Sequence, residues 1–428
     1  MSATRRVAEL AFATGMVASS GAIAQEVTVT PPPVPAEGAP PPAGTTSAPP
    51  PAEAAAPAVA KPSGWDPEDG GFHLRSPDGQ YRLRFGLQAA YKIEPVWIEG
   101  DNKTRSSFAF LRPIMEGSLF RKWIRFWTSL DLNSNPPYVL DSYVEVQPVD
   151  AAGVRAGQFW TPISRHEQYG PQQLLFAEWS LVADYFWPGR DKGVMAFGTP
   201  FDSKFEYYAG VFSGSPLRTN KSIPGNWEVM ARFAFNPLGP AGGSNEFPYI
   251  VKPGAAPAPF RWSLAVQGWT GKVQSGVENF NPSTFRFDFA PSGEITKTLA
   301  GGVDMFIQGS HFSFLAEGYM RRIEYEGSPR FTGIGGFGQL GVMIIPHFMD
   351  IAGRVNWLDP SMDLSNDRFW SLEAQTAFYI SSSQHLVLKA RYGYGHQESP
   401  GADQGKVPLP VGSTGPIHLA TLQMNVMF

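Results

Sequence analysis

The feature that most limits the fold of this chain is an alternation of apolar and polar residues, clearest at its C-terminal end. Every second position there is apolar: Ala420, Leu422, Met424, Val426 and Phe428. The residues between them are mostly polar, as with Gln423 and Asn425. Successive side chains of a β-strand point to opposite faces, so the pattern predicts a strand with one apolar face. One such strand fits a soluble sandwich or a transmembrane barrel equally well.

The alternation recurs along most of the chain. It predicts about sixteen strands, many of them near the roughly ten residues that a tilted membrane strand needs. The predicted strands are 80–93, 106–118, 121–132, 138–147, 153–159, 193–198, 204–212, 227–235, 261–269, 298–308, 311–324, 335–345, 348–356, 369–380, 385–395 and 417–428.

The length of the connection after a strand depends on whether that strand is even-numbered or odd-numbered along the chain. Connections after even-numbered strands are mostly very short, such as 119–120, 309–310 and 346–347. Those after odd-numbered strands are mostly long, such as 160–192, 270–297 and 396–416. Two exceptions are 236–260, which is long, and 133–137, which is short. Short turns alternating with long external loops are typical of outer-membrane barrels, whereas a soluble sandwich has no reason to sort its loops this way.

A membrane sheet of this kind must close on itself. An unpaired strand edge in hydrocarbon costs several kcal/mol per group, as an order of magnitude. At about sixteen strands, side chains cannot fill the interior and an aqueous channel remains. The sequence therefore predicts an all-β fold, a transmembrane antiparallel β-barrel that forms a pore.

Composition and motifs exclude several function classes. The chain has no cysteine, which excludes a disulfide framework and thiolate chemistry. Its net charge of −4 argues against nucleic acid as a partner. No His-Glu-x-x-His or Gly-x-Ser-x-Gly motif occurs, so we expect no metal, no cofactor and no enzyme activity. A Ser-His hydrolase assembled across strands remains an alternative.

The N-terminal region predicts export. Arg5 and Arg6 precede an apolar stretch, and Ala-Ile-Ala at 22–24 has the spacing of a cleavage site. We therefore predict a signal peptide at 1–24. Residues 25–70 are rich in proline and alanine, which predicts a disordered periplasmic linker of extended geometry. The barrel domain is then 71–428.

A set of motifs lies between residues 71 and 214. They are Asp-Gly at 78–79, RPIMEG at 112–117, DSYVE at 141–145, RAGQF at 155–159 with Pro162, AEWSL at 177–181, GRDKGV at 189–194 and YAGVFSG at 208–214. Together they resemble the phosphate-selective porin O/P family. The resemblance implies a sixteen-strand barrel in the bacterial outer membrane, usually a homotrimer. It also implies that the third external loop, which the strand pattern places at 160–192, folds inward and narrows the channel.

The resemblance also implies passive diffusion of small hydrophilic solutes, with anions such as phosphate preferred. Where family members known for phosphate uptake often carry Arg-Arg-x-Arg on the second strand, residues 109–112 read Ala-Phe-Leu-Arg, so only Arg112 corresponds. The alternatives are a general or sugar-type porin without phosphate selectivity, an outer-membrane barrel enzyme, and a structural barrel with a plugged lumen.

Anion selectivity needs positive potential at the narrowest point of a channel, so basic residues are the candidate lining. They are Arg82, Arg84, Lys92, Arg112, Arg125, Arg165, Arg190, Lys192, Arg232, Lys389 and Arg391. Arg82 and Arg84 are favoured because like charges on one face repel unless an anion compensates. The alternative is that the arginines pair across strands with Asp131, Glu145, Glu228 or Glu373.

Aromatic residues suggest further contacts. Tryptophans such as Trp123 and Trp227 predict belts at the membrane interface, where the barrel meets lipid and lipopolysaccharide; the alternative is a sugar-binding slide. The terminal aromatic, Phe428, is the expected assembly signal for the barrel-assembly machinery.

Overall fold

The computed structural model describes most of the predicted barrel domain. The described residues are 63–66, 70–98, 101–134, 136–214, 225–243, 245–281, 286–325, 330–365, 367–381, 385–398 and 415–428. The predicted signal peptide, 1–24, lies outside the described residues, and so does 25–62 of the predicted linker.

The described residues form one sheet of eighteen strands. The strands are β1 (Gly64–Trp65), β2 (Phe72–Arg75), β3 (Arg82–Ile98), β4 (Asp101–Leu119), β5 (Arg121–Asp131), β6 (Tyr138–Val149), β7 (Ala152–Trp160), β8 (Arg190–Gly198), β9 (Phe205–Phe212), β10 (Trp227–Phe235), β11 (Arg261–Asn281), β12 (Arg286–Gln308), β13 (Phe312–Tyr325), β14 (Arg330–Ile345), β15 (Met349–Asp359), β16 (Phe369–Tyr379), β17 (Leu386–Gln397) and β18 (Gly415–Met427).

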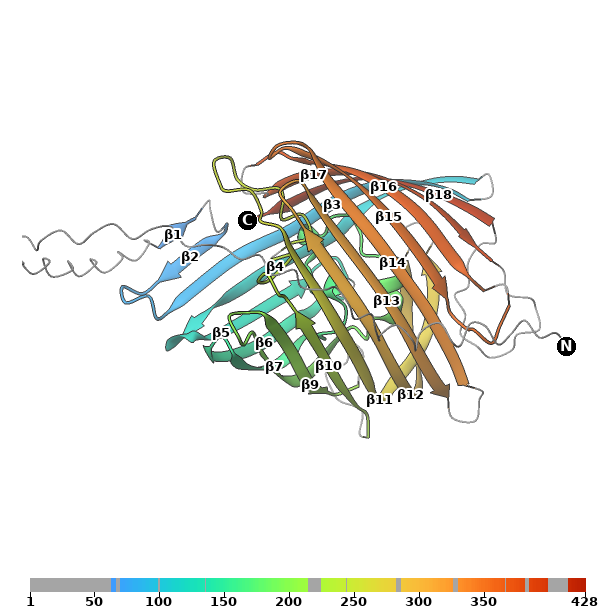
Figure 1. The fold of residues 1–428 in the computed structure, drawn as a ribbon, viewed down its shortest axis with the longest axis horizontal. Coiled ribbons are helices and arrows are strands. Elements are labelled where there is room, and N and C mark those ends of the chain that lie inside the picture. Colours follow the sequence, from blue (N-terminus) through green and yellow to red (C-terminus); the bar gives the residue numbers. More distant parts are fainter. Residues whose placement is uncertain are drawn as a thin grey trace, which may run out of the picture. The chain divides into compact units, whose positions relative to one another are not determined.

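Strands β3 to β18 form a closed barrel (Figure 1). Each pairs antiparallel with the next along the chain, and β18 pairs back onto β3, with Met424 opposite Tyr91. These are the sixteen strands of the barrel, so the predicted fold class and strand count are confirmed. Closure gives each barrel strand two neighbours, although some strands extend beyond one of them, as where β4 pairs with β5 only over Ile114–Leu119.

The direction of burial separates a barrel from a sandwich. On β10 the apolar side chains of Trp227, Val229 and Phe233 are exposed, whereas the alternate residues Glu228 and Arg232 are buried. A soluble sandwich buries its apolar faces, but here the apolar face points away from the interior. A lipid environment requires this arrangement. Among the described residues, no helix is long and apolar enough to cross a membrane.

A short hairpin and the chain end complete the seam between the first and last barrel strands. β18 ends opposite Gln88, and the Phe428 N–H then donates to the Leu87 carbonyl at 3.0 Å. Beyond that point β2 pairs with the free edge of β3, and β1 pairs with β2. The Trp65 ring lies 6.0 Å from the Phe428 ring. The predicted domain boundary at residue 71 falls inside this hairpin.

One predicted loop is wrong. Residues 270–297 were expected to form a long external loop, as the connection after an odd-numbered strand. In the structure β11 runs on to Asn281 and β12 begins at Arg286, with a register shift between Gln274 and Gly276. The two strands stay paired as a long hairpin, which satisfies backbone groups that an open loop would leave to solvent.

Two connections enter the barrel from opposite ends. The first is the long inward loop (161–189) between β7 and β8, and it carries α1 (Arg165–Gln168), η2 (Pro171–Gln173) and α2 (Leu181–Phe186). The second inward segment (236–260) joins β10 to β11 at the end where Phe428 lies, and its Phe247 and Tyr249 are buried. The connection that was too long for a turn is therefore a lumen-filling segment.

Candidate functional site

The long inward loop is a compact unit with its own caps. The Ser164 hydroxyl accepts a hydrogen bond from the Glu167 N–H at 3.0 Å and donates to Glu317 on β13 at 2.7 Å. The Ser180 hydroxyl accepts from the first N–H groups of α2. Side-chain oxygens at these positions satisfy helix donors that have no intrahelical partner. The loop thus lies inside the barrel, as the family resemblance implies.

Inward-facing polar side chains of strands β11 to β18 bind the backbone of this loop. Gln375 accepts from the Ala177 N–H at 2.7 Å, and Arg354 donates to the Glu178 carbonyl at 2.9 Å. Lys389 donates to two carbonyls of the loop, at 2.7 and 3.0 Å. The polar face that the alternation predicts therefore serves, on this side of the barrel, to attach the loop.

Glycines on β14 make room for both inward segments. A Cβ at Gly335 would lie 2.9 Å from the Phe186 ring of α2. A Cβ at Gly341 would lie 2.3 Å from the Tyr249 hydroxyl of the second inward segment. Both distances are shorter than a normal contact, so larger residues would displace the segments.

The two inward segments meet at a buried histidine–glutamate pair. His166 Nε2 accepts from the Ser180 N–H at 2.7 Å, so its Nδ1 carries the proton and donates to Glu246. Burial alone would raise the pKa of Glu246, but His166 and the N–H donors of Leu175 and Gln339 hold it below its usual range. In a catalytic Ser-His pair the serine hydroxyl donates to the imidazole. Here the Ser180 backbone N–H donates to the His166 ring, and the Ser180 hydroxyl donates to Asn356.

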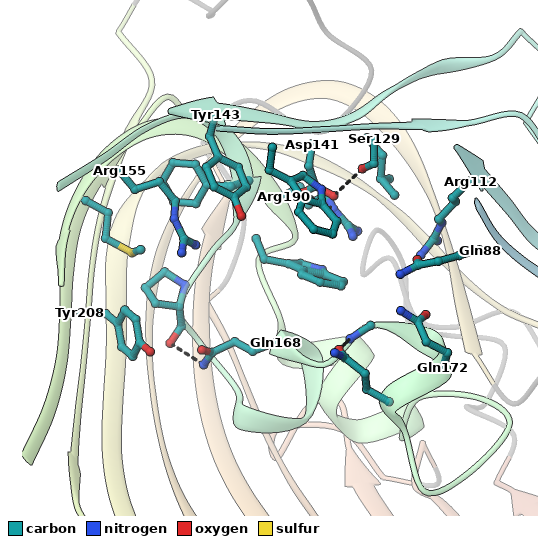
Figure 2. A pocket seen from close by; sticks show the side chains of 18 residues that line it. Gln88, Arg112, Ser129, Asp141, Tyr143, Arg155, Gln168, Gln172, Arg190 and Tyr208 are labelled. Atoms are coloured by element: carbon teal, nitrogen blue, oxygen red, sulfur yellow. Dashed lines mark hydrogen bonds and ion pairs between the residues drawn. The ribbon is translucent and has the colours of Figure 1, made fainter. Parts of the chain in front are cut away.

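A cavity of about 300 Å³ lies between the long inward loop and the wall formed by β3 to β9 (Figure 2). The loop contributes its glutamines Gln168, Gln172 and Gln173. The wall contributes arginines, aromatic residues and a few other side chains: Gln88, Arg112, Trp127, Ser129, Leu140, Asp141, Tyr143, Arg155, Phe159, Trp160, Arg190, Met195 and Tyr208. We call this space the arginine pocket.

Arg190 is the most enclosed cation of the arginine pocket. Its Nε donates to Asp141 at 2.9 Å, and Ser129 donates to the other oxygen of that carboxylate at 3.0 Å. The guanidinium lies 4.0 Å from the centre of the Trp160 ring. The side chain is 7% exposed, and its Nη2 has no hydrogen-bond acceptor among the described residues.

Arg155 and Arg112 complete the positive lining. Arg155 donates twice to Glu145, at 2.9 and 2.6 Å, and lies 4.6 Å from the Tyr143 ring. Arg112 stands opposite Gln88 on β3 and 5.4 Å from the Phe110 ring. In the part of the chain that the structure describes, Arg112 has no acidic side chain within ion-pair distance.

Two of the predicted candidates, Arg112 and Arg190, line the arginine pocket. Lys192 does not line it: on β8 it lies opposite Gln158 of β7, on the strand face of the exposed Val194. Arg82 and Arg84 lie near the end of the barrel that holds Phe428. There Arg84 pairs with Glu116 at 3.0 Å. The carboxylate of Glu116 is therefore the anion that compensates the two like charges, and no solute anion is needed.

The other predicted cations are held in ion pairs or hydrogen bonds. Arg125 pairs with Glu145 near the same barrel end, half exposed. The rest lie against the inward segments and are buried: Lys92 with Glu178, Arg165 and Arg232 with Asp304, Arg391 with Glu373, and Lys389 with loop carbonyls. The geometry of these residues therefore agrees with the alternative reading, in which basic side chains are paired within the protein and do not line the channel.

Sequence reasoning missed three functional features: Arg155, Trp160 and the second inward segment. From the sequence, Arg155 was named only as part of a motif. The apolar Val154 and Ala156 on either side of it point outward, which places Arg155 on the inner face. The length of 236–260, too great for a turn, was the sequence signal for the second inward segment. Nothing in the sequence pointed to the His166–Glu246 pair, whose members are eighty residues apart.

The sequence matches no protein-family model and no curated protein. Similar solved structures include in-vitro folded OmpT, an outer membrane protein of Vibrio cholerae (9% identity, TM-score 0.54, covering 83% of this chain and 99% of that one). An anion-selective porin from Comamonas acidovorans has 10% identity and a TM-score of 0.56, covering 81% and 99%. The trimer form of OmpT has 11% identity and a TM-score of 0.55, covering 81% and 99%. The fold of this chain is therefore the one that outer-membrane porin barrels share.

Proposed function

We propose that this protein is an outer-membrane channel through which small hydrophilic solutes diffuse passively, with anions preferred. The arginine pocket is the observation that carries the proposal. It lies between the long inward loop and the wall of β3 to β9, and it places three guanidinium groups against one lining carboxylate, Asp141. Low-dielectric walls focus such a field and raise the local concentration of anions. The fold shared with an anion-selective porin supports the same conclusion.

The route of the solute follows from where the inward segments lie. Both contact strands on the β11 to β18 side, and residues there such as Gln423 and Arg354 are buried. The arginine pocket is on the β3 to β9 side. We therefore propose an off-centre pathway along that wall, past the glutamines of the long inward loop.

Reversal potentials in a salt gradient across planar bilayers test the proposal. We expect anion preference in the wild type and a weaker preference in Arg112→Gln, because this variant removes the cation without an acidic partner. The matched control is Arg330→Gln, which changes a cation that is 66% exposed and paired with Glu324, away from the pocket. Added phosphate should reduce the chloride current of the wild type.

Cation preference in the wild type would contradict the anion proposal, and lack of conductance from folded protein would favour a plugged structural barrel. Turnover of phospholipid or peptide by the detergent-purified protein would instead support the enzyme alternative.

We also propose that the protein is a homotrimer in the bacterial outer membrane, exported by the segment 1–24 and tethered to a linker at 25–70. The outward face of β6 to β9 supports a subunit contact because, apart from Phe205 at the start of β9, many of its exposed side chains are small. They are Val144, Val146, Val154, Ala156, Val194, Ala196, Ala209 and Val211. Small side chains let membrane-embedded surfaces pack closely.

A further inference from the structure

We propose that the arginine pocket selects flat organic anions, aromatic monocarboxylates as a class, over compact inorganic anions and over non-planar carboxylates of equal charge. This inference rests on the proposed function, because it takes the pocket to be on the solute path. Three independent features of the pocket carry it: unpaired donors, charge balance and flat surfaces.

The first feature is a set of hydrogen-bond donors without acceptors. Arg190 Nη2, Arg112 Nε and Trp160 Nε1 have no hydrogen-bond partner among the described residues. They come from three different strands around one cavity. Buried donors that lack an acceptor are costly, so a ligand rich in acceptor oxygens, such as a carboxylate, relieves the cost.

The second feature is the charge balance. Arg190 pairs with Asp141, and Arg155 pairs with Glu145, which half-exposed Arg125 shares outside the pocket. Arg112 is the lining cation that has no carboxylate partner in the described part of the chain. The lining therefore carries excess positive charge that includes Arg112, which favours an anionic ligand over a neutral one.

The third feature is the flat lining. The guanidinium of Arg190 lies over Trp160, and that of Arg155 lies over Tyr143. Guanidinium and aromatic faces both stack on planar rings. Figure 2 shows Arg112, Gln88 and Gln172 at one end of the pocket and Tyr143, Arg155 and Tyr208 at the other.

The two ends suit the two parts of one ligand. The carboxylate binds between Arg112 and Arg190, and the ring lies toward Trp160 and Tyr143. A compact anion uses the first end alone.

The test compares benzoate with cyclohexanecarboxylate, benzamide and inorganic phosphate. One readout is the concentration of each that halves the chloride current in planar bilayers. The second, which needs no conductance, is equilibrium dialysis of labelled benzoate against the detergent-solubilised full chain. We expect benzoate to act at about tenfold lower concentration than cyclohexanecarboxylate, because only benzoate stacks. Benzamide and phosphate should be weaker than benzoate.

Two variants separate charge from stacking. Arg112→Gln should weaken both carboxylates about tenfold, since it removes a charge-assisted contact. Trp160→Leu should weaken both carboxylates, because it removes the Trp160 Nε1 donor, but it should weaken benzoate more, because only benzoate also loses a stacking face. Trp262→Leu, on the outer surface beside Phe235, is the control and should change neither. Heat-shifted gel mobility checks folding, and if Trp160→Leu does not fold, the wild-type ligand series decides.

Equal potency of benzoate and cyclohexanecarboxylate in the wild type would overturn the inference while leaving an anion-conducting channel in place. If the protein binds benzoate more tightly than cyclohexanecarboxylate in dialysis but shows no conductance, the pocket assignment would stand and the channel proposal would fail.

Discussion

The buried cations of the lumen show what sequence patterning can and cannot reveal about single residues. Alternation places Lys389 and Arg232 on the inner face, and both do point inward. It cannot reveal their partners, because these come from distant segments. Lys389 binds carbonyls more than two hundred residues away, and Arg232 binds Asp304. Whether an inward arginine faces solutes or anchors a loop depends on tertiary packing alone.

Glu246 gives a prediction about pH. Its folded-state pKa lies below the ordinary value of 4.5, so its pair with His166 stabilises the junction of the inward segments at neutral pH. That stabilisation is lost as the pH falls below 4.5 and through the folded pKa. We expect the current to rise on acidification as the second inward segment loosens. Conductance recorded over this pH range measures the effect.

Glu246→Gln should show the larger current already at neutral pH and lose most of the acid response. Glu324→Gln, a partly exposed carboxylate paired with Arg330, serves as the control. An unchanged acid response in Glu246→Gln would show that other groups cause it.

At the level of elements, β14 combines strand alternation with an unusual number of glycines. Glycine inside a strand often marks a close approach of another backbone or side chain. The sequence of 330–345 could therefore have predicted that something packs against this strand. It could not identify α2 and Tyr249 as the contacts, because they belong to connections on either end of the barrel.

Gly335→Leu tests the role of this strand. The added side chain points at Phe186 and should displace α2, costing about 1–3 kcal/mol, as overpacking typically does. We expect a lower unfolding temperature by heat-shifted gel mobility and a larger single-channel conductance. In the matched control Gly338→Leu, the new Cβ faces outward and meets only Phe314 at 4.0 Å. Similar results for both variants would mean that glycine itself, not the room it leaves, matters at these positions.

Connection lengths were informative at this scale, although not uniformly. The excess length of 236–260 signalled a segment with a role of its own, and the structure places it in the lumen. For 270–297, length and position after an odd-numbered strand indicated a loop, but pairing between β11 and β12 continues through much of it. Connection length is a weak guide where two long strands can extend a ladder that already exists.

At the level of the whole molecule, the fold was predictable because two sequence patterns, strand alternation and the regular change in connection length, indicated the same architecture. Alternation within strands and parity between connections both follow from a sheet that faces lipid on one side and crosses the membrane repeatedly. The filling of the lumen was not predictable, since it depends on contacts between connections and strands far apart in the sequence. A pore inferred from strand number alone is therefore wider than the passage that remains.

The proposed trimer gives a prediction at this scale. Val154→Trp combined with Val211→Trp enlarges the outward face of β7 and β9, and we expect it to prevent close packing between subunits. Chemical cross-linking followed by unheated gel electrophoresis should show trimers for the wild type and monomers for the variant. Val303→Trp makes the same change on the outward face of β12 and should leave trimers intact. A trimer that survives the double substitution would place the contact elsewhere.

The seam between β18 and β3 has a consequence for the timing of folding. It joins residues more than three hundred positions apart, and its last bonds involve Phe428 and Leu87. Contacts of such long sequence separation form slowly, because the chain between them must first be ordered. The first barrel strand therefore waits for β18 to form, and until then both edges are open to pairing with other chains. A chain without β18 has no means of closing this seam, so protection of the open edges before closure is as much a requirement of this architecture as its lipid-facing surface.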